Sequence, residues 1–116
     1  MKTIVVDGVE YIPKSETAQN EEGLKYVIAR TYSAGVFAGY LQSKNGKEVV
    51  LINARRLWYW DGAASLSQLA MEGVSKPENC KFPCEVGRVE LTEVIEILDC
   101  TEESRLNIKN VNVWTQ

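Results

Sequence analysis

The fold is decided by residues 36–54, whose sequence is VFAGYLQSKNGKEVVLINA. Val36–Leu41 and Glu48–Ala54 are rich in β-branched and aromatic residues, which favour strands. The Asn45-Gly46 dipeptide between them tolerates positive φ and is typical of a hairpin turn. Because residues 49–52 are all apolar, the second strand should be covered on both faces. The sequence therefore predicts that this strand is a central strand of the sheet.

Further strands are predicted on both sides of this hairpin. Their β-branched content is high, and turn residues separate them. The segments are 26–32, followed by a bend at Ser33-Ala34-Gly35; 88–98, as one strand; 111–114, as a final strand; and 3–6 with 9–12, as a hairpin around Asp7-Gly8.

Two helices complete the prediction. Asp61 is a credible N-cap for a helix over residues 62–72, with Gly73 at its C-terminal end. Thr101 followed by two acidic residues indicates a second helix that ends near Asn107. The predicted fold class is α+β, an antiparallel sheet of hairpins with two helices packed on it.

Composition narrows the class of protein. A chain of 116 residues predicts one domain, with an N-terminal hairpin and loop over 1–24 and a core over 25–116. The net charge of −3 argues against DNA binding, and no apolar run is long enough for a membrane span. The apolar run at the N-terminus is too short for a signal peptide, so three cysteines indicate a reduced, cytosolic protein. Because the sequence has no histidine, we expect no metal site, no cofactor and no catalysis.

The most informative block is 53–61, in which Arg55 and Arg56 stand beside Trp58 and Trp60. Guanidinium groups bind phosphates and aromatic faces stack on bases, so the block suits a nucleotide. The alternative is structural: the two tryptophans share a strand face and fill the core, while both arginines are solvated.

Weaker signals lie elsewhere. The turn at 30–37 combines a cation, hydroxyls and a glycine, so its backbone amides are candidates to hold an anion; a β-bulge explains it equally well. Phe82, near Arg88, is either a stacking platform or a hydrophobic plug. Arg105 and Lys109 are four residues apart and share a helix face, where they add positive field to a site or only solubilise the helix.

Four blocks, residues 30–39, 53–66, 77–82 and 93–98, resemble a known family, the first type of Thoeris anti-defence proteins. The resemblance spans about residues 26 to 115. It implies a phage or prophage protein in the host bacterial cytoplasm that binds a cyclic ADP-ribose isomer, glycocyclic ADP-ribose, without degrading it. It also implies that the protein forms a homodimer, and that three dimers assemble into a hexamer as a larger form. A further implication is that the protein captures cyclic oligonucleotides of the CBASS pathway.

Such a ligand has an adenine, riboses and a pyrophosphate, which the chemistry of the matching blocks can serve. Arginines would neutralise the phosphates, aromatic rings would stack on adenine, and Asn53 or Thr92 would bind its polar edge. Two alternatives stay open: an enzyme that degrades a nucleotide signal, and an inhibitor that binds a defence effector through its tryptophans. The predicted ligand-binding residues are Arg30, Tyr32, Ser33, Gly35, Phe37, Asn53, Arg55, Arg56, Trp58, Trp60, Phe82, Arg88, Thr92 and Lys109.

Overall fold

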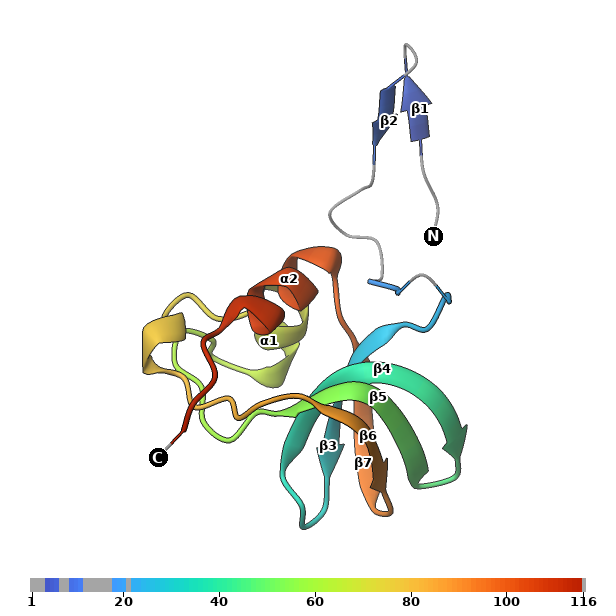
Figure 1. The fold of residues 1–116 in the computed structure, drawn as a ribbon, viewed down its shortest axis with the longest axis vertical. Coiled ribbons are helices and arrows are strands. Elements are labelled where there is room, and N and C mark those ends of the chain that lie inside the picture. The colour runs from blue at the N-terminus through green and yellow to red at the C-terminus, as the bar shows by residue number, and fades with distance from the viewer. Residues whose placement is uncertain (1–3, 7–8, 12–17, 21, 116) are drawn as a thin grey trace.

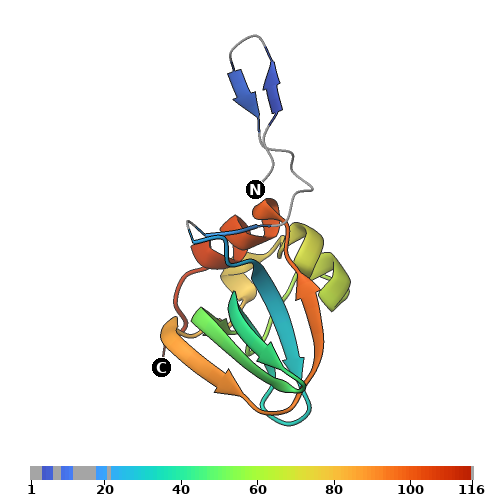
Figure 2. The same ribbon diagram turned by 90° about the vertical axis from the view of Figure 1, so that its right-hand side faces the viewer.

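A computed structural model of the chain describes residues 4–6, 9–11, 18–20 and 22–115. Its main body is an antiparallel five-stranded sheet with two helices on one side, which confirms the predicted α+β class (Figures 1 and 2). The strands of this sheet are β3 (Tyr26–Thr31), β4 (Val36–Asn45), β5 (Glu48–Arg56), β6 (Val86–Leu91) and β7 (Val94–Asp99).

The predicted central hairpin is confirmed. The strand order is β6-β5-β4-β3-β7, so β5 has a neighbour on each side. Asn45 pairs with Glu48, which leaves Gly46 and Lys47 as the turn, one residue later than predicted. Gly46 has a φ of 62°, a left-handed conformation that glycine adopts without steric cost.

The N-terminal strands form a sheet of their own. β1 (Ile4–Val6) pairs antiparallel with β2 (Val9–Tyr11), in agreement with the predicted hairpin. The predicted turn residues Asp7 and Gly8 lie outside the described residues.

Two strand predictions were wrong. Residues 88–98 form two strands, β6 and β7, because the chain turns at Thr92-Glu93 and sends β6 to pair with β5 and β7 to pair with β3. The turn is fixed by hydrogen bonds from the Val94 amide to the Lys47 carbonyl and from the Tyr32 amide to the Glu93 carbonyl. Residues 111–114 form no strand, and Val113 makes only an isolated parallel bridge to Phe82.

The helices begin and end where their capping groups allow. Helix α1 spans Leu66–Glu72, four residues shorter at its start than predicted, because Ser65 rather than Asp61 caps it by accepting the Gln68 amide. Its predicted end at Gly73 is confirmed. Helix α2 spans Glu102–Asn110, with Thr101 as the predicted N-cap, and ends three residues later than expected. A short 3₁₀ helix, η1, covers Pro77–Asn79.

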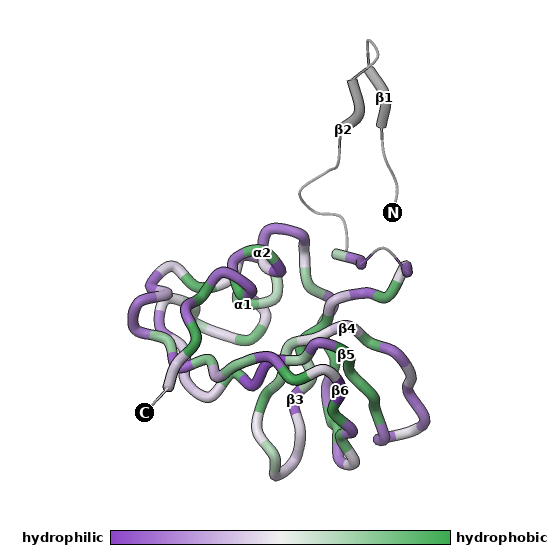
Figure 3. Tube along the Cα trace, viewed as in Figure 1, coloured by the Kyte–Doolittle hydropathy of each residue, from purple (hydrophilic) through white to green (hydrophobic). Residues whose placement is uncertain are grey.

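The two faces of the sheet cover separate apolar clusters. Along β3, Tyr26 and Ile28 belong to the cluster beneath the helices, and Val27 and Ala29 belong to the cluster on the opposite face. All four are fully buried, as expected for a strand covered on both sides. Figure 3 shows hydrophilic residues at the β4–β5 turn.

Polar contacts fix α2 against α1. The Ser104 hydroxyl donates to the Leu69 carbonyl at 2.6 Å, and the Thr101 hydroxyl donates to the Met71 carbonyl at 2.6 Å. Asn107 donates to the Val74 carbonyl and accepts from the Val74 amide, at 2.8 Å each. These bonds fix the orientation of α2, and therefore the direction of its basic residues.

Candidate functional site

A bulge in β5 creates an unusual backbone conformation at Asn53. The register shifts there, so that three steps along β5 oppose two steps along β4. Asn53 has a φ of 49° and is the one non-glycine residue with positive φ in the described part of the chain. The opposite strand accommodates the bulge through Gly39, at which a Cβ would lie 2.9 Å from the Cα of Ala54.

The exposed Asn53 side chain lines a polar surface pocket of about 460 Å³. Within the described part of the chain, the side-chain amide of Asn53 makes no hydrogen bond to another residue, and it is therefore available to a ligand. The pocket lies between β4, β5, α2 and the segment that precedes β3, and its lining is Gln19, Asn20, Glu22, Tyr40, Asn53, Arg105 and Lys109.

Helix α2 supplies the positive charge of this pocket. Arg105 and Lys109 share a helix face, as predicted, and both meet Tyr40 of β4. The Arg105 guanidinium donates to the Tyr40 hydroxyl at 3.0 Å, and the Lys109 Nζ lies 5.6 Å from the centroid of the Tyr40 ring. Tyr40 is 5% exposed, so it forms the floor of the pocket rather than a free stacking platform.

Both cations already have acidic partners. Arg105 pairs with Glu102 in the preceding turn of α2, and this hydrogen bond raises the pKa of the guanidinium, which stays charged. Lys109 Nζ lies 2.8 Å from a carboxylate oxygen of Glu85, in the segment before β6. An anionic ligand therefore meets two fixed cations whose charges are partly balanced.

The predicted ligand-binding role of Arg55 and Phe82 is corrected by the structure, because both side chains lie in the interior. Arg55 is 3% exposed and donates to the carbonyls of Pro83, Ile108 and Phe82, at 2.7, 2.8 and 2.9 Å. Phe82 is 0% exposed, and its ring lies under the Arg55 guanidinium. Burial lowers the pKa of Arg55, but three carbonyl acceptors replace the water that it loses. Arg55 thus joins β5, α2 and the segment before β6, and faces no ligand.

Arg56 and Phe37 form a pair on the other face of the sheet. The Arg56 guanidinium lies 4.5 Å from the centroid of the Phe37 ring and donates to the Ala34 carbonyl at 2.9 Å. Phe37 is 4% exposed, so its ring belongs to the core rather than to a stacking surface. Arg56 is exposed, as the structural interpretation of this block expected.

The turn between β3 and β4 closes on itself. The Thr31 amide donates to the Gly35 carbonyl, and the Ala34 amide donates to the Thr31 hydroxyl, so these amides are not free for an anion. Gly35 has a φ of 93°, which this turn requires. Tyr32 is 77% exposed, and the Ser33 hydroxyl donates to Glu93 at 2.9 Å.

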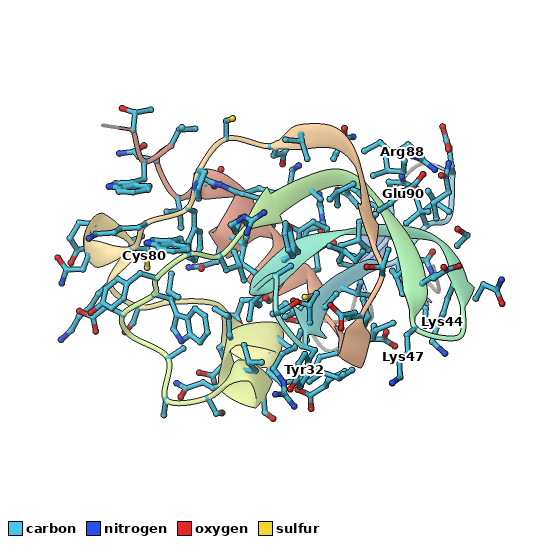
Figure 4. All side chains as sticks on the ribbon, turned by 90° about the horizontal axis from the view of Figure 1, so that it is seen from below. Tyr32, Lys44, Lys47, Cys80, Arg88 and Glu90 are labelled. Atoms are coloured by element: carbon cyan, nitrogen blue, oxygen red, sulfur yellow. The ribbon has the colours of Figure 1, made fainter. Side chains whose placement is uncertain are left out.

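The remaining predicted residues lie apart from one another. Arg30 pairs with Glu96, and Arg88 pairs with Glu90 on the edge strand β6. Thr92 is exposed at the β6–β7 turn. Figure 4 shows Tyr32 and the Arg88–Glu90 pair at separate places on the molecule.

The two tryptophans of the predicted block differ in their surroundings. Trp58 is 64% exposed. Trp60 is partly buried and packs against the cluster beneath the helices. They follow β5, which ends at Arg56, and therefore do not share a strand face.

Of the predicted ligand-binding residues, the structure brings only Asn53 and Lys109 together in this pocket. Arg105, which the sequence singled out by its helix spacing, joins them. Tyr40, Gln19, Asn20 and Glu22 were missed, since nothing in the sequence indicated that they line a pocket with α2. The available signal was the pair of Gly39 and Asn53, two residues that tolerate the geometry of a bulge.

The described residues include no group of three or more His, Cys, Asp or Glu side chains placed to hold a metal ion. The three cysteines are free thiols. Cys80 and Cys100 are buried, and burial raises the pKa of both, to about 12 for Cys100. These two thiols are therefore unreactive and belong to the core.

The chain is similar to a known protein family. A family model described as a domain of unknown function, DUF6948, matches residues 24–108, which cover α1, every strand of the five-stranded sheet and α2 as far as Ile108. The chain belongs to this family. No curated protein and no solved structure matches the sequence. No described helix is both long and apolar enough to cross a membrane.

Proposed function

We propose that this protein binds and sequesters a cyclic ADP-ribose-type signal, glycocyclic ADP-ribose, and so blocks Thoeris immune signalling as a phage anti-defence protein. The observation that carries the proposal is a pocket lined by an unpartnered side-chain amide, Asn53, by two cations of α2 and by a buried phenol, Tyr40. The resemblance of four sequence blocks to anti-defence proteins supplies the identity of the ligand.

The chemistry of the pocket suits such a ligand. Arg105 and Lys109 offer two positive charges to a pyrophosphate with about two negative charges. The Asn53 amide can both donate to and accept from the edge of an adenine or a ribose. The pocket volume of about 460 Å³ lies within the range of small-molecule sites.

Binding without reaction is the second part of the proposal. Among the described residues that line the pocket there is no Ser, Thr, Cys or His nucleophile, and Glu22 is the one carboxylate. A general base would have to be Glu22, whose hydrogen bond to Asn20 is made through its backbone amide rather than its carboxylate. The ligand is thus held by charge and hydrogen bonds, and it leaves unchanged.

The setting of the protein follows from the same resemblance. We propose that it acts in the host bacterial cytoplasm as a homodimer that builds a hexamer, a trimer of dimers. The pocket is open to solvent, and a second copy would give it the enclosure that tight binding requires. Cyclic oligonucleotides of CBASS are proposed as a second class of captured signal.

The test is recovery of the ligand. The purified protein is mixed with glycocyclic ADP-ribose, freed of unbound ligand by filtration, and then heated, and the filtrates are analysed by mass spectrometry. We expect little ligand before heating and intact ligand after it. Asn53→Ala and Lys109→Ala should retain roughly tenfold less, because each removes a polar contact with the ligand. Lys44→Ala, on the exposed end of β4, is the matched control.

Other outcomes separate the alternative functions. Conversion of the ligand to a smaller product would contradict sequestration and indicate an enzyme. A second candidate, an inhibitor that binds a defence effector, is favoured by Trp58 and Tyr59, which are adjacent and 64% and 50% exposed. Calorimetry that shows no heat with the free metabolite, together with retained inhibition of the defence system, would support this candidate instead.

A further inference from the structure

Lys109 and Arg105 are restrained in different ways. Arg105 is bound by Glu102 of its own helix, three residues away, and the two side chains are 19% and 30% exposed. Lys109 is bound by Glu85, which lies 24 residues earlier in the chain and outside any helix or strand. The Lys109 and Glu85 side chains are 30% and 37% exposed. The Lys109 pair is therefore the more hydrated of the two, and hydrated ion pairs are weak enough to open.

Lys109 Nζ has two neighbours, only one of which lines the pocket. The Tyr40 ring on the pocket floor has its centroid 5.6 Å away, and the Glu85 carboxylate lies 2.8 Å away. Lys109 and Tyr40 line the pocket, and Glu85 does not. A phosphate inside the pocket and Glu85 outside it therefore compete for one ammonium group.

We propose that Glu85 sets the affinity of this pocket for anions, as an internal carboxylate that a bound anion must displace from Lys109. The inference rests on the proposed function, because it concerns the same pocket and the same class of ligand. Every anion must break the Lys109–Glu85 pair, but only a ligand that also contacts Asn53 and Tyr40 gains compensating interactions. Because every anion bears this cost, Glu85 lowers the affinity for pyrophosphate and for a nucleotide by about the same factor.

The experiment compares two neutralising variants. Glu85→Gln removes the competitor. Glu103→Gln causes the same change in net charge, but Glu103 lines a different pocket together with Gln68 and Glu72 of α1. Isothermal titration at one ionic strength measures the affinity of the wild type and both variants for glycocyclic ADP-ribose and for inorganic pyrophosphate.

We expect Glu85→Gln to bind both probes roughly fivefold more tightly than Glu103→Gln, the scale of a partly exposed ion pair. The gain should be about the same for the two probes, because the same ion pair no longer has to be broken in either case. Equal affinities of the two variants, weaker binding by Glu85→Gln, or no pyrophosphate binding by any of the three proteins would overturn the inference. If the wild type does not bind the metabolite while Glu85→Gln still gains affinity for pyrophosphate, the proposed function fails. Competition between Glu85 and an anion for Lys109 is then still supported.

Discussion

The pocket beside α2 and the turn between β3 and β4 contain similar residues in very different states. Each has an arginine against an aromatic ring: Arg105 with Tyr40 in the pocket, and Arg56 with Phe37 near the turn. At the turn, the polar groups bind one another, whereas in the pocket the Asn53 amide stays available. Closely spaced residues of the kind that bind ligands therefore do not form a binding site when they already hydrogen-bond to one another.

The largest expected difference is between the adjacent residues Arg55 and Arg56. Arg55→Ala leaves three carbonyls without their donor in the interior, so it should lower the free energy of unfolding by about 3 to 5 kcal/mol. Arg56→Ala removes an exposed contact with Phe37 and should cost about 1 kcal/mol. Urea denaturation of both variants measures the difference, and equal losses would show that the two side chains are not divided between interior and surface.

The second prediction concerns the bulge that sets the position of Asn53. In Gly39→Ala, the new Cβ would lie 2.9 Å from the Cα and Cβ of Ala54, so the strands must separate. We expect a loss of about 1 to 3 kcal/mol in the free energy of unfolding. Metabolite binding should weaken as well, although residue 39 does not line the pocket.

Gly87→Ala is the control for this variant, because a Cβ at residue 87 of β6 meets nothing within 4 Å. If Gly39→Ala keeps full stability and binding, the close approach of β4 to β5 does not hold the pocket in shape.

The smallest effect is expected at Trp58, an exposed aromatic residue of the predicted block. Because Trp58 is 64% exposed, Trp58→Ala should change the free energy of unfolding by less than about 1 kcal/mol. It should also leave metabolite binding unchanged, since Trp58 does not line the pocket. A loss of several kcal/mol would favour the core-filling role that the sequence offered, and a loss of binding would move the site to the segment that follows β5.

The fold could largely be predicted, because local signals decide it. The apolar run 49–52, the glycine turn after Asn45 and the Thr101 cap each act through neighbouring residues, and each gave a correct element. The Ser65 cap was missed because Asp61 is an equally good capping residue, and only the positive φ of Gly62 shows that the helix cannot begin there.

The site was harder to predict, since it depends on residues that are distant in sequence. A single extra residue at Asn53 sends Arg55 to the helix side and Arg56 to the opposite face. The hydrophobic pattern of the strand does not indicate this bulge. Tyr40, Asn53 and Arg105 meet only because α2 is fixed against α1 and packs beside the sheet. The i, i+4 spacing of Arg105 and Lys109 was the one part of the pocket that a local rule supplied.

The most direct measurement is a titration of isotope-labelled protein with glycocyclic ADP-ribose, followed by backbone amide NMR. Our account predicts that the largest shift changes fall at Tyr40, Asn53, Arg105 and Lys109, and that the ligand is recovered intact. Changes centred on Tyr32, Gly35 and Arg56 instead, or no changes at all, would contradict it.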